Sequence, residues 1–196
     1  MIIQHDELVN EESGLKETVK FLVQILSGVA EFRDLQSGDP VVRYHIDRIQ
    51  SYTRVMCENM AVFYPESGIG SSDTIESIVL ASALHDLGKI AVPDSILTKR
   101  GKLTSEEFAE MKNHTRYGAK LLDSFVTKKD NFFRFARDIC LYHHERYDGK
   151  GYPEGLRGDV IPLWSQIVGI ADVYDALVNK KVYRGAFSRE KTEKMI

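Results

Sequence analysis

The segment that decides the fold is residues 75–89, IESIVLASALHDLGK. Its apolar residues recur at helical spacing, and it closes on the dipeptide His85-Asp86. Gly88 permits a tight exit from a helix, and Pro93 then fixes the direction of the chain. We therefore predict a strongly apolar helix over 75–89, with a histidine and a carboxylate near its end.

Apolar residues keep helical spacing along almost the whole chain. An N-terminal helix over residues 15–32 carries a heptad-like apolar stripe, and a polar break over 36–40 follows it. Thr104 and Glu107 belong to a capping box, which starts a helix that carries His114. Further helices are predicted over 45–60, 131–145 and 163–177. The sequence shows no strand-like alternation, so it predicts an all-α helical bundle.

The composition is typical of a globular protein with no strong charge bias. The chain has 196 residues, enough for one domain or one domain with an extension. Its net charge of −3 excludes a bulk attraction to nucleic acid or acidic lipid. Cys57 and Cys140 lie in apolar helical stretches and are expected to be reduced core residues. With no signal-peptide pattern and no membrane-length apolar run, we expect a cytoplasmic protein without membrane or nucleic-acid-polymer partners.

Most of the histidines occur in the predicted helices, where they accompany two aspartates. Five of the six histidines belong to this set. Its members are His45, His85, His114, His143, His144, Asp86 and Asp172. Helical bundles commonly hold metals in their core, and imidazole with carboxylate suits iron, manganese, zinc or nickel better than calcium. Asp86 could give one oxygen to each of two ions, so we predict a two-metal site that Asp86 bridges.

Lys89 follows Asp86 by three residues and His85 by four, which places all three on one helical face. An ammonium group there could neutralise a phosphate oxygen held over the metals. Each of these patterns has a simpler interpretation. Lys89 equally fits a lysine that complements the dipole at a helix C-terminus. Residues 143–146 equally fit a solvated helix end, and residues 148–155 a surface turn. The joint placement of the histidines at the ends of apolar helices favours the metal site.

Seven blocks of sequence carry a more specific signal. They are His45-x-x-Arg48, His85-Asp86-x-Gly88-Lys89-Ile90, Ile96-Leu97-x-Lys99, Leu103-Thr104-x-Glu106-Glu107, Met111-Lys112-x-His114, His143-His144-Glu145-Arg146-x-Asp148-Gly149-x-Gly151-Tyr152-Pro153 and Ala171-Asp172-x-Tyr174-Asp175-Ala176-Leu177. In this order, from about Glu31 to the end of the chain, they resemble the HD-GYP subfamily of HD-domain phosphohydrolases. The block that ends in Gly151-Tyr152-Pro153 is the most specific of the seven.

The resemblance implies an all-α HD-domain bundle with a metal site in its core. Residues 37–196 would form the HD-GYP domain, and residues 1–36 an N-terminal linker or signalling helix. The metal ligands implied are His45, His85, Asp86, His114, His143, His144 and Asp172. They would hold two divalent transition metal ions, iron or manganese in preference to zinc or nickel.

The activity that the resemblance implies is metal-dependent hydrolysis of the bacterial second messenger cyclic di-GMP. A metal-bridging hydroxide would attack the phosphorus and give pGpG, with GMP as a second product. Asp86 and Lys89 would be catalytic, and Lys89, Tyr152, Lys181 and Arg184 would contact substrate. The loop with Tyr152 could also bind a diguanylate cyclase domain. The helix over 15–32 suggests an upstream receiver or sensor domain and a homodimer.

Several positions differ from the family pattern. Val41 replaces a glutamate that holds a third metal in some members, and Gln36 is separated from His45 by an apparent insertion, which favours two metals. Gln166 and Lys181 replace arginines of the family. The helix that begins at Ser188 ends with the chain at residue 196, so a domain truncated at its C-terminus is expected. Two alternatives remain: an HD hydrolase for another nucleotide, and a non-catalytic module that binds a dinucleotide or a partner.

Overall fold

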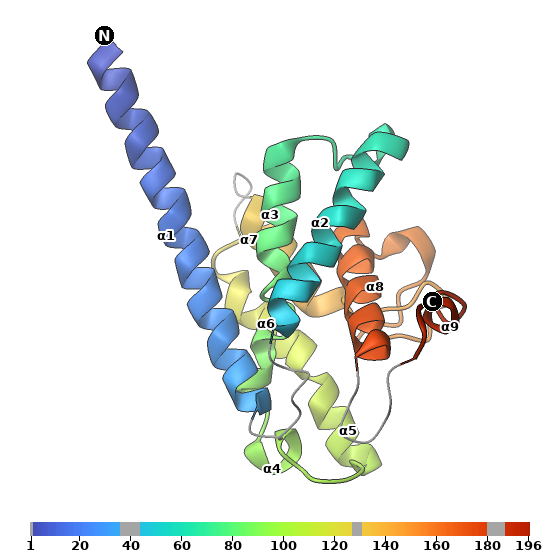
Figure 1. The fold of residues 1–196 in the computed structure, drawn as a ribbon. Helices are drawn as coiled ribbons and strands as arrows, with labels where there is room; N and C mark the ends of the chain where they lie inside the picture. The colour runs from blue at the N-terminus through green and yellow to red at the C-terminus, as the bar shows by residue number, and fades with distance from the viewer. Residues whose placement is uncertain (1, 36–43, 127–130, 180–186) are drawn as a thin grey trace.

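The computed structural model describes residues 2–35, 44–126, 131–179 and 187–196, and its regular secondary structure is entirely helical (Figure 1), which confirms the all-α prediction. The α-helices are α1 (Ile2–Leu35), α2 (His45–Phe63), α3 (Ser72–Ser82), α4 (Asp94–Leu97), α5 (Ser105–Lys112), α6 (His114–Asp123), α7 (Asn131–Tyr142), α8 (Leu163–Val178) and α9 (Arg189–Glu193). Short 3-10 helices are η2 (Pro65–Ser67), η3 (Leu87–Ala91) and η4 (Gly158–Val160). None of the helices described combines the length and apolar character needed to cross a membrane.

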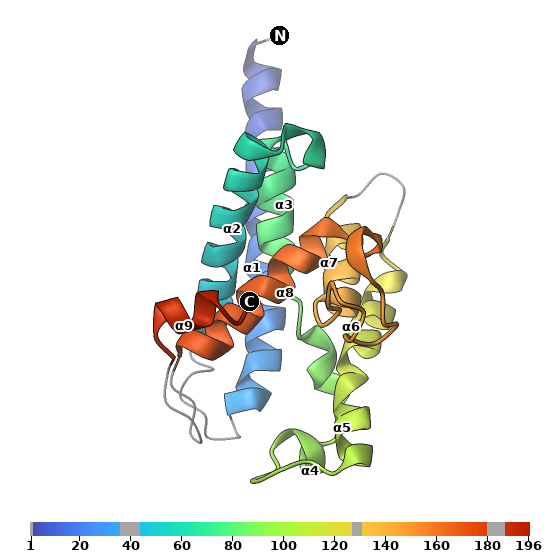
Figure 2. The same cartoon turned by 90° about the vertical axis from the view of Figure 1, so that its right-hand side faces the viewer.

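Five helices and η3 form the bundle (Figure 2). Helix α2 packs on α3 and α8, α7 packs on α3, α6 and α8, and α6 packs on η3. Fully buried side chains at the centre include Ile49, Ile78, Leu84, Ile139 and Val168. Along a helix the buried residues recur every three or four positions, as Ile49, Thr53 and Cys57 do in α2, so the helix presents one buried stripe to its neighbours and leaves its polar side in water.

Helix α1 is longer than the predicted 15–32 helix, and its N-terminal part extends beyond the bundle in both views (Figures 1 and 2). Its C-terminal half packs on η3, and Val23 and Ala30 are buried there. Large apolar side chains on the same helix remain exposed, namely Phe21, Leu22, Ile25, Leu26, Val29 and Phe32. Helix α1 therefore has two apolar sides, of which the described residues cover only one.

The prediction of one helix over 75–89 is wrong at its C-terminal end. Helix α3 ends at Ser82, and the amides of Ala83, Leu84 and His85 bond to carbonyls three residues earlier. The reason is a close backbone contact between distant segments. A Cβ on Gly88 would lie 1.8 Å from the carbonyl oxygen of His114, so this segment must turn tightly against α6. His85 and Asp86 therefore lie in the turn before η3, not inside a helix.

Two other predicted helices also end earlier than expected. The capping box is confirmed, because the Thr104 hydroxyl accepts from the Glu107 amide and the Glu107 carboxylate accepts from the Thr104 amide. However, the helix breaks at Asn113, so His114 starts α6. Helix α7 ends at Tyr142, before the 143–145 segment. Most of the candidate ligands therefore lie at helix ends, which converge beside one another in the bundle.

Candidate metal centre

The structure brings all seven predicted metal ligands together as two neighbouring groups. The His114 group consists of Asp86, His114, His143 and His144, and the His45 group consists of His45, His85 and Asp172. Within each group one ligand atom from every residue lies within 4.8 Å of the others. The ligands come from the turn before η3, the starts of α2 and α6, the end of α7 and the middle of α8. Residues far apart in sequence therefore form one site.

Asp86 lies between the two groups, with one carboxylate oxygen toward each. Its Oδ1 is 3.3 Å from Nε2 of His114 and 3.8 Å from Nε2 of His143. Its Oδ2 is 3.3 Å from Nε2 of His85, in the other group. This is the arrangement of a carboxylate able to bridge two ions.

The His45 group is equally compact. Nε2 of His45 lies 3.4 Å from Nε2 of His85 and 3.6 Å from Oδ1 of Asp172. His45 is the first residue of α2, whereas Asp172 lies within α8. Contact between α2 and α8 thus brings an imidazole and a carboxylate to the same point.

The imidazole rings are held by their Nδ1 atoms. Nδ1 lies 2.9 Å from the Ser82 carbonyl in His85, 2.7 Å from the Met111 carbonyl in His114 and 2.9 Å from the Ile139 carbonyl in His143. A carbonyl can only accept, so Nδ1 must donate and, in the neutral ring, Nε2 carries the lone pair. These carbonyls belong to the last turns of α3, α5 and α7, where further acceptor capacity is available. The helix ends therefore orient the Nε2 atoms toward the centre of the site.

Three atoms at the centre lack a hydrogen-bond partner within the described part of the chain. Asp86 Oδ1, His114 Nε2 and His143 Nε2 are all buried. Leaving such atoms unpaired costs about 1–3 kcal/mol each, and all three are acceptors once Nδ1 is protonated. A cation among them would satisfy them together. The nitrogen and oxygen donors, without thiolate, fit a divalent metal ion.

Burial and charge set the protonation states in the metal-free protein. Burial lowers the pKa of His114 and His143, and it lowers the pKa of His144 to about 4. Burial also opposes protonation of His85, but the nearby Asp86 carboxylate overrides it and raises the pKa of His85 to about 9. The three histidines of the His114 group are therefore neutral near pH 7, which is the form that binds a metal.

Lys89 lies beside the metal-ligand groups. Its Nζ is 2.8 Å from Oδ2 of Asp86. Burial by itself would raise the pKa of Asp86. The charges of Lys89 and His85 have the larger effect and hold this pKa well below its usual range. The side chain of Lys89 is 21% exposed, so it is partly open to solvent. A cation at this place can meet an anionic ligand that reaches the two groups.

The structure places one of the other predicted substrate contacts. The Tyr152 ring lies against the His144 ring with 4.7 Å between centroids, and Lys112 Nζ lies 5.8 Å from the Tyr152 centroid. Lys181 and Arg184, together with the departures at Gln36 and Val41, lie outside the described residues. Gln166 donates to the Ile161 carbonyl at 2.9 Å.

Sequence reasoning gave no role to Asp175, which positions His45. Asp175 is 1% exposed, and its carboxylate accepts from Nδ1 of His45 at 2.8 Å. It also accepts from Arg48 Nε at 2.6 Å and Nη2 at 2.9 Å. Burial by itself would raise the pKa of Asp175, but these hydrogen bonds have the larger effect and bring the pKa below its usual value. Its position three residues after Asp172, on the same helical face, was the available signal.

Glu145 also lacked a predicted role, and it holds the loop that follows the histidine pair. Its carboxylate accepts from the backbone amides of Glu154, Gly155 and Leu156 at 2.7, 3.0 and 3.0 Å. A Cβ on Gly151 would lie 2.4–2.5 Å from the backbone of residues 144–146. The loop is therefore packed on the end of α7, which places Tyr152 beside His144.

Comparison with known proteins agrees with this geometry. Residues 40–195 match a family model described as HD domain. The chain is 40% identical over 195 residues to a cyclic di-GMP phosphodiesterase of Vibrio cholerae, which covers 97% of this chain and 38% of that protein. It is 40% identical over 184 residues to the 3'3'-cGAMP-specific phosphodiesterase 2 of the same organism, covering 94% and 32%.

A further relative is the cyclic di-GMP phosphodiesterase response regulator RpfG of Xanthomonas campestris pv. campestris. Identity is 47% over 120 residues, which is 61% of this chain and 31% of that protein. The chain thus spans less than half the length of these relatives. Because the family model covers most of the sequence, the chain belongs to the HD domain family, as its resemblance to the HD-GYP subfamily predicts.

Proposed function

We propose that this chain is the phosphodiesterase domain of a protein that hydrolyses cyclic di-GMP to pGpG; a second round of hydrolysis on pGpG would give GMP. The observation that carries the proposal is the pair of neighbouring ligand groups, with one oxygen of Asp86 close to a histidine of each. The names of the relatives support the substrate. A cyclic dinucleotide has two phosphodiesters and no terminal phosphate, so cleavage requires charge neutralisation at an internal phosphate.

The seven residues of the two groups would hold two divalent transition metal ions, with iron or manganese preferred over zinc or nickel. When bound, such ions lower the pKa of water and neutralise phosphoryl charge. Asp86 would lie between the ions, because its two oxygens face different groups. The neutral histidines of the His114 group support this assignment, because protonated imidazole cannot bind a metal.

The protein's own side chains would bind and orient the substrate. Lys89 Nζ would contact a non-bridging phosphoryl oxygen, since it already lies beside the shared carboxylate. Hydrolysis breaks the bond from phosphorus to a ribose 3'-oxygen, adding hydroxide to phosphorus and a proton to that oxygen. Charge grows on the phosphoryl oxygens during this step, and a fixed ammonium stabilises it. Tyr152, Lys181 and Arg184 would contact the rest of the dinucleotide.

The test uses the chain purified without chelators. Elemental analysis should find about two metals per chain, one for each ligand group. Chromatography should show metal-dependent conversion of cyclic di-GMP to pGpG. The double variant His85→Ala/Asp86→Ala should lose both properties. Asp159→Asn, at an exposed position of η4, is the matched control and should keep them. A wild-type chain that binds no metal would refute the proposal.

A second substrate has specific support, because one relative is named for 3'3'-cGAMP. Both cyclic dinucleotides carry the same phosphodiesters, so the metal centre alone does not distinguish them. Competition between the two at equal concentration would measure the ratio of their kcat/KM values. Faster hydrolysis of cGAMP than of cyclic di-GMP would support the alternative of an HD hydrolase for another nucleotide. Metal binding and dinucleotide binding without turnover would instead support the non-catalytic module.

The proposed partners follow from exposed surfaces and from the sequence. Leu22, Ile25, Val29 and Phe32 are exposed on α1 at alternating spacings of three and four residues, which is typical of a coiled-coil interface. We propose a homodimer through this face, an upstream receiver or sensor domain, and binding of a diguanylate cyclase domain at the loop with Tyr152. Sedimentation of wild type and of Ile25→Glu would test the dimer. A cytoplasmic location and the division at residue 36 stay predictions.

A further inference from the structure

The C-terminal end of α1 lies against both sides of the candidate metal centre. Arg33 reaches the 3-10 segment that carries Lys89. Its Nη1 donates to the Lys89 carbonyl at 2.8 Å and also to the Ile90 carbonyl, and its Nη2 donates to the Val92 carbonyl at 2.8 Å. The Asp94 carboxylate completes this set of acceptors. One guanidinium therefore holds the carbonyl of Lys89 and those of Ile90 and Val92, which follow it.

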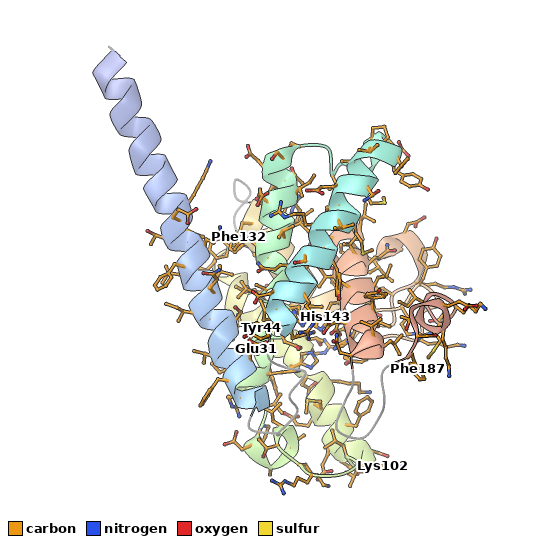
Figure 3. The ribbon with its side chains drawn as sticks, viewed as in Figure 1. Glu31, Tyr44, Lys102, Phe132, His143 and Phe187 are labelled. Carbon is orange, nitrogen blue, oxygen red and sulfur yellow. The ribbon has the colours of Figure 1, made fainter. Side chains whose placement is uncertain are left out.

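Two residues earlier on α1, Glu31 faces the start of α2. Burial raises the pKa of Glu31 above its usual value. The His45 side chain and the backbone N–H groups of Ile46 and His45 offset only part of this increase. Its Oε1 is a buried atom with no hydrogen-bond partner among the described residues. Figure 3 shows Glu31 beside Tyr44, where α2 begins. The carboxylate thus lies at the N-terminus of the helix whose first residue is His45.

Among the described residues next to it, helix α2 has no local cap that could take this role. The residue before it, Tyr44, has a φ of 65° and makes no side-chain capping bond. The first N–H groups of a helix need acceptors and carry a partial positive charge, so a carboxylate there is stabilising. Glu31 is a carboxylate that meets this need from another helix. The position of α1 therefore bears on the position of His45.

We propose that Glu31 and Arg33 are positioning residues that couple the placement of α1 to the metal centre. Glu31 acts on the His45 group through the first turn of α2, and Arg33 acts on Asp86 and Lys89 through η3. The inference rests on the metal centre proposed above. It goes beyond it by assigning α1 a route to both ligand groups, so that a displacement of α1 changes metal binding.

Titration of the metal-free chain with Mn²⁺, followed by electron paramagnetic resonance, tests the role of Glu31. Wild type should bind two ions with the spectrum of a coupled pair. Glu31→Gln keeps the shape and removes the charge, so it should weaken one of the two ions by about tenfold or more, as loss of outer-shell partners typically does. Its matched control is Glu17→Gln, an exposed position on the same helix. Should Glu31→Gln fail to fold, the same titration of Glu31→Asp decides.

Hydrogen exchange tests the role of Arg33. Arg33→Lys keeps the charge but loses the forked donors, so the amides of residues 87–92 should exchange faster and kcat should fall several-fold. Arg100→Lys, in an exposed loop, is the control. The inference would be overturned, and the metal centre left standing, by two results together. Glu31→Gln would bind two Mn²⁺ ions with wild-type affinity, and Arg33→Lys would show unchanged hydrogen exchange. A wild-type chain that binds no Mn²⁺ would overturn the metal centre and the inference together.

Discussion

Asp175 Oδ2 lies 2.8 Å from His45 Nδ1, although 130 residues separate the two in the chain. The carboxylate fixes the ring of a candidate ligand and, through Arg48, ties the first turn of α2 to α8. A carboxylate that accepts from the ring nitrogen not bound to the metal orients a ligating imidazole and raises its basicity. The relationship explains why a carboxylate can be buried at this position without binding a metal itself.

Asp175→Asn should therefore weaken metal binding at the His45 group by about 10- to 100-fold. The amide keeps the volume of the side chain but cannot accept from His45 and Arg48 as a charged group. Metal titration with a competing chelator measures the effect. Asp159→Asn serves as the surface control. If Asp175→Asn retains wild-type affinity at both groups, Asp175 has only a structural role.

Gly88→Ala should destabilise the fold by about 3 kcal/mol or more, the upper range for overpacking. The added methyl would meet the His114 carbonyl at 1.8 Å and the Gly118 amide at 2.4 Å, and both are backbone atoms. Urea unfolding measures the change. Gly28→Ala is the matched control, because no atom of the described residues lies within 4 Å of the added Cβ on the exposed side of α1. That control should stabilise the protein by about 0.5–1 kcal/mol.

The metal-free protein should lose stability as the pH falls from about 6.5 to about 4. The pKa of His144 is about 4 in the folded protein and near its usual value of about 6.5 when unfolded, so the unfolded state binds the proton first. The loss from this residue is about 3 kcal/mol at the acid end. His85, with a raised pKa, changes its contribution only above this window.

His144→Gln should remove this part of the acid sensitivity. Unfolding of wild type and variant by urea at several pH values between 4 and 7 gives the difference directly. As the pH falls from 7 to 4, the free energy of unfolding of wild type should decrease by about 3 kcal/mol more than that of the variant. Parallel pH profiles would show that His144 does not titrate as its burial implies.

Both cysteines should resist alkylation in the native protein. Cys57 is fully buried, and burial raises its pKa to about 11, so little thiolate forms at pH 8. Burial also raises the pKa of Cys140, whose thiol donates to the Leu84 carbonyl at 2.9 Å. Mass spectrometry after maleimide treatment should show no adduct on native protein and two on unfolded protein. Val62→Cys, at an exposed position, should react at once.

The sequence alone determined the helical class and the types of ligand. Apolar spacing is a local property, so helices such as α8 could be predicted from neighbouring residues. The histidines and aspartates that form the two groups were also chosen from sequence, because donor chemistry belongs to each residue. The capping box at Thr104 is likewise local.

Only the tertiary structure decided where the helices end and which partners the ligands have. Helix α3 stops at Ser82 because Gly88 meets the backbone of α6, a contact between segments that are distant in sequence. The pairing of His45 with Asp175 and the reach of Arg33 to the Lys89 carbonyl depend in the same way on packing between helices. Such contacts are set by the whole core, so a local pattern can place Asp175 on the same helical face as Asp172 but cannot identify His45 as its partner.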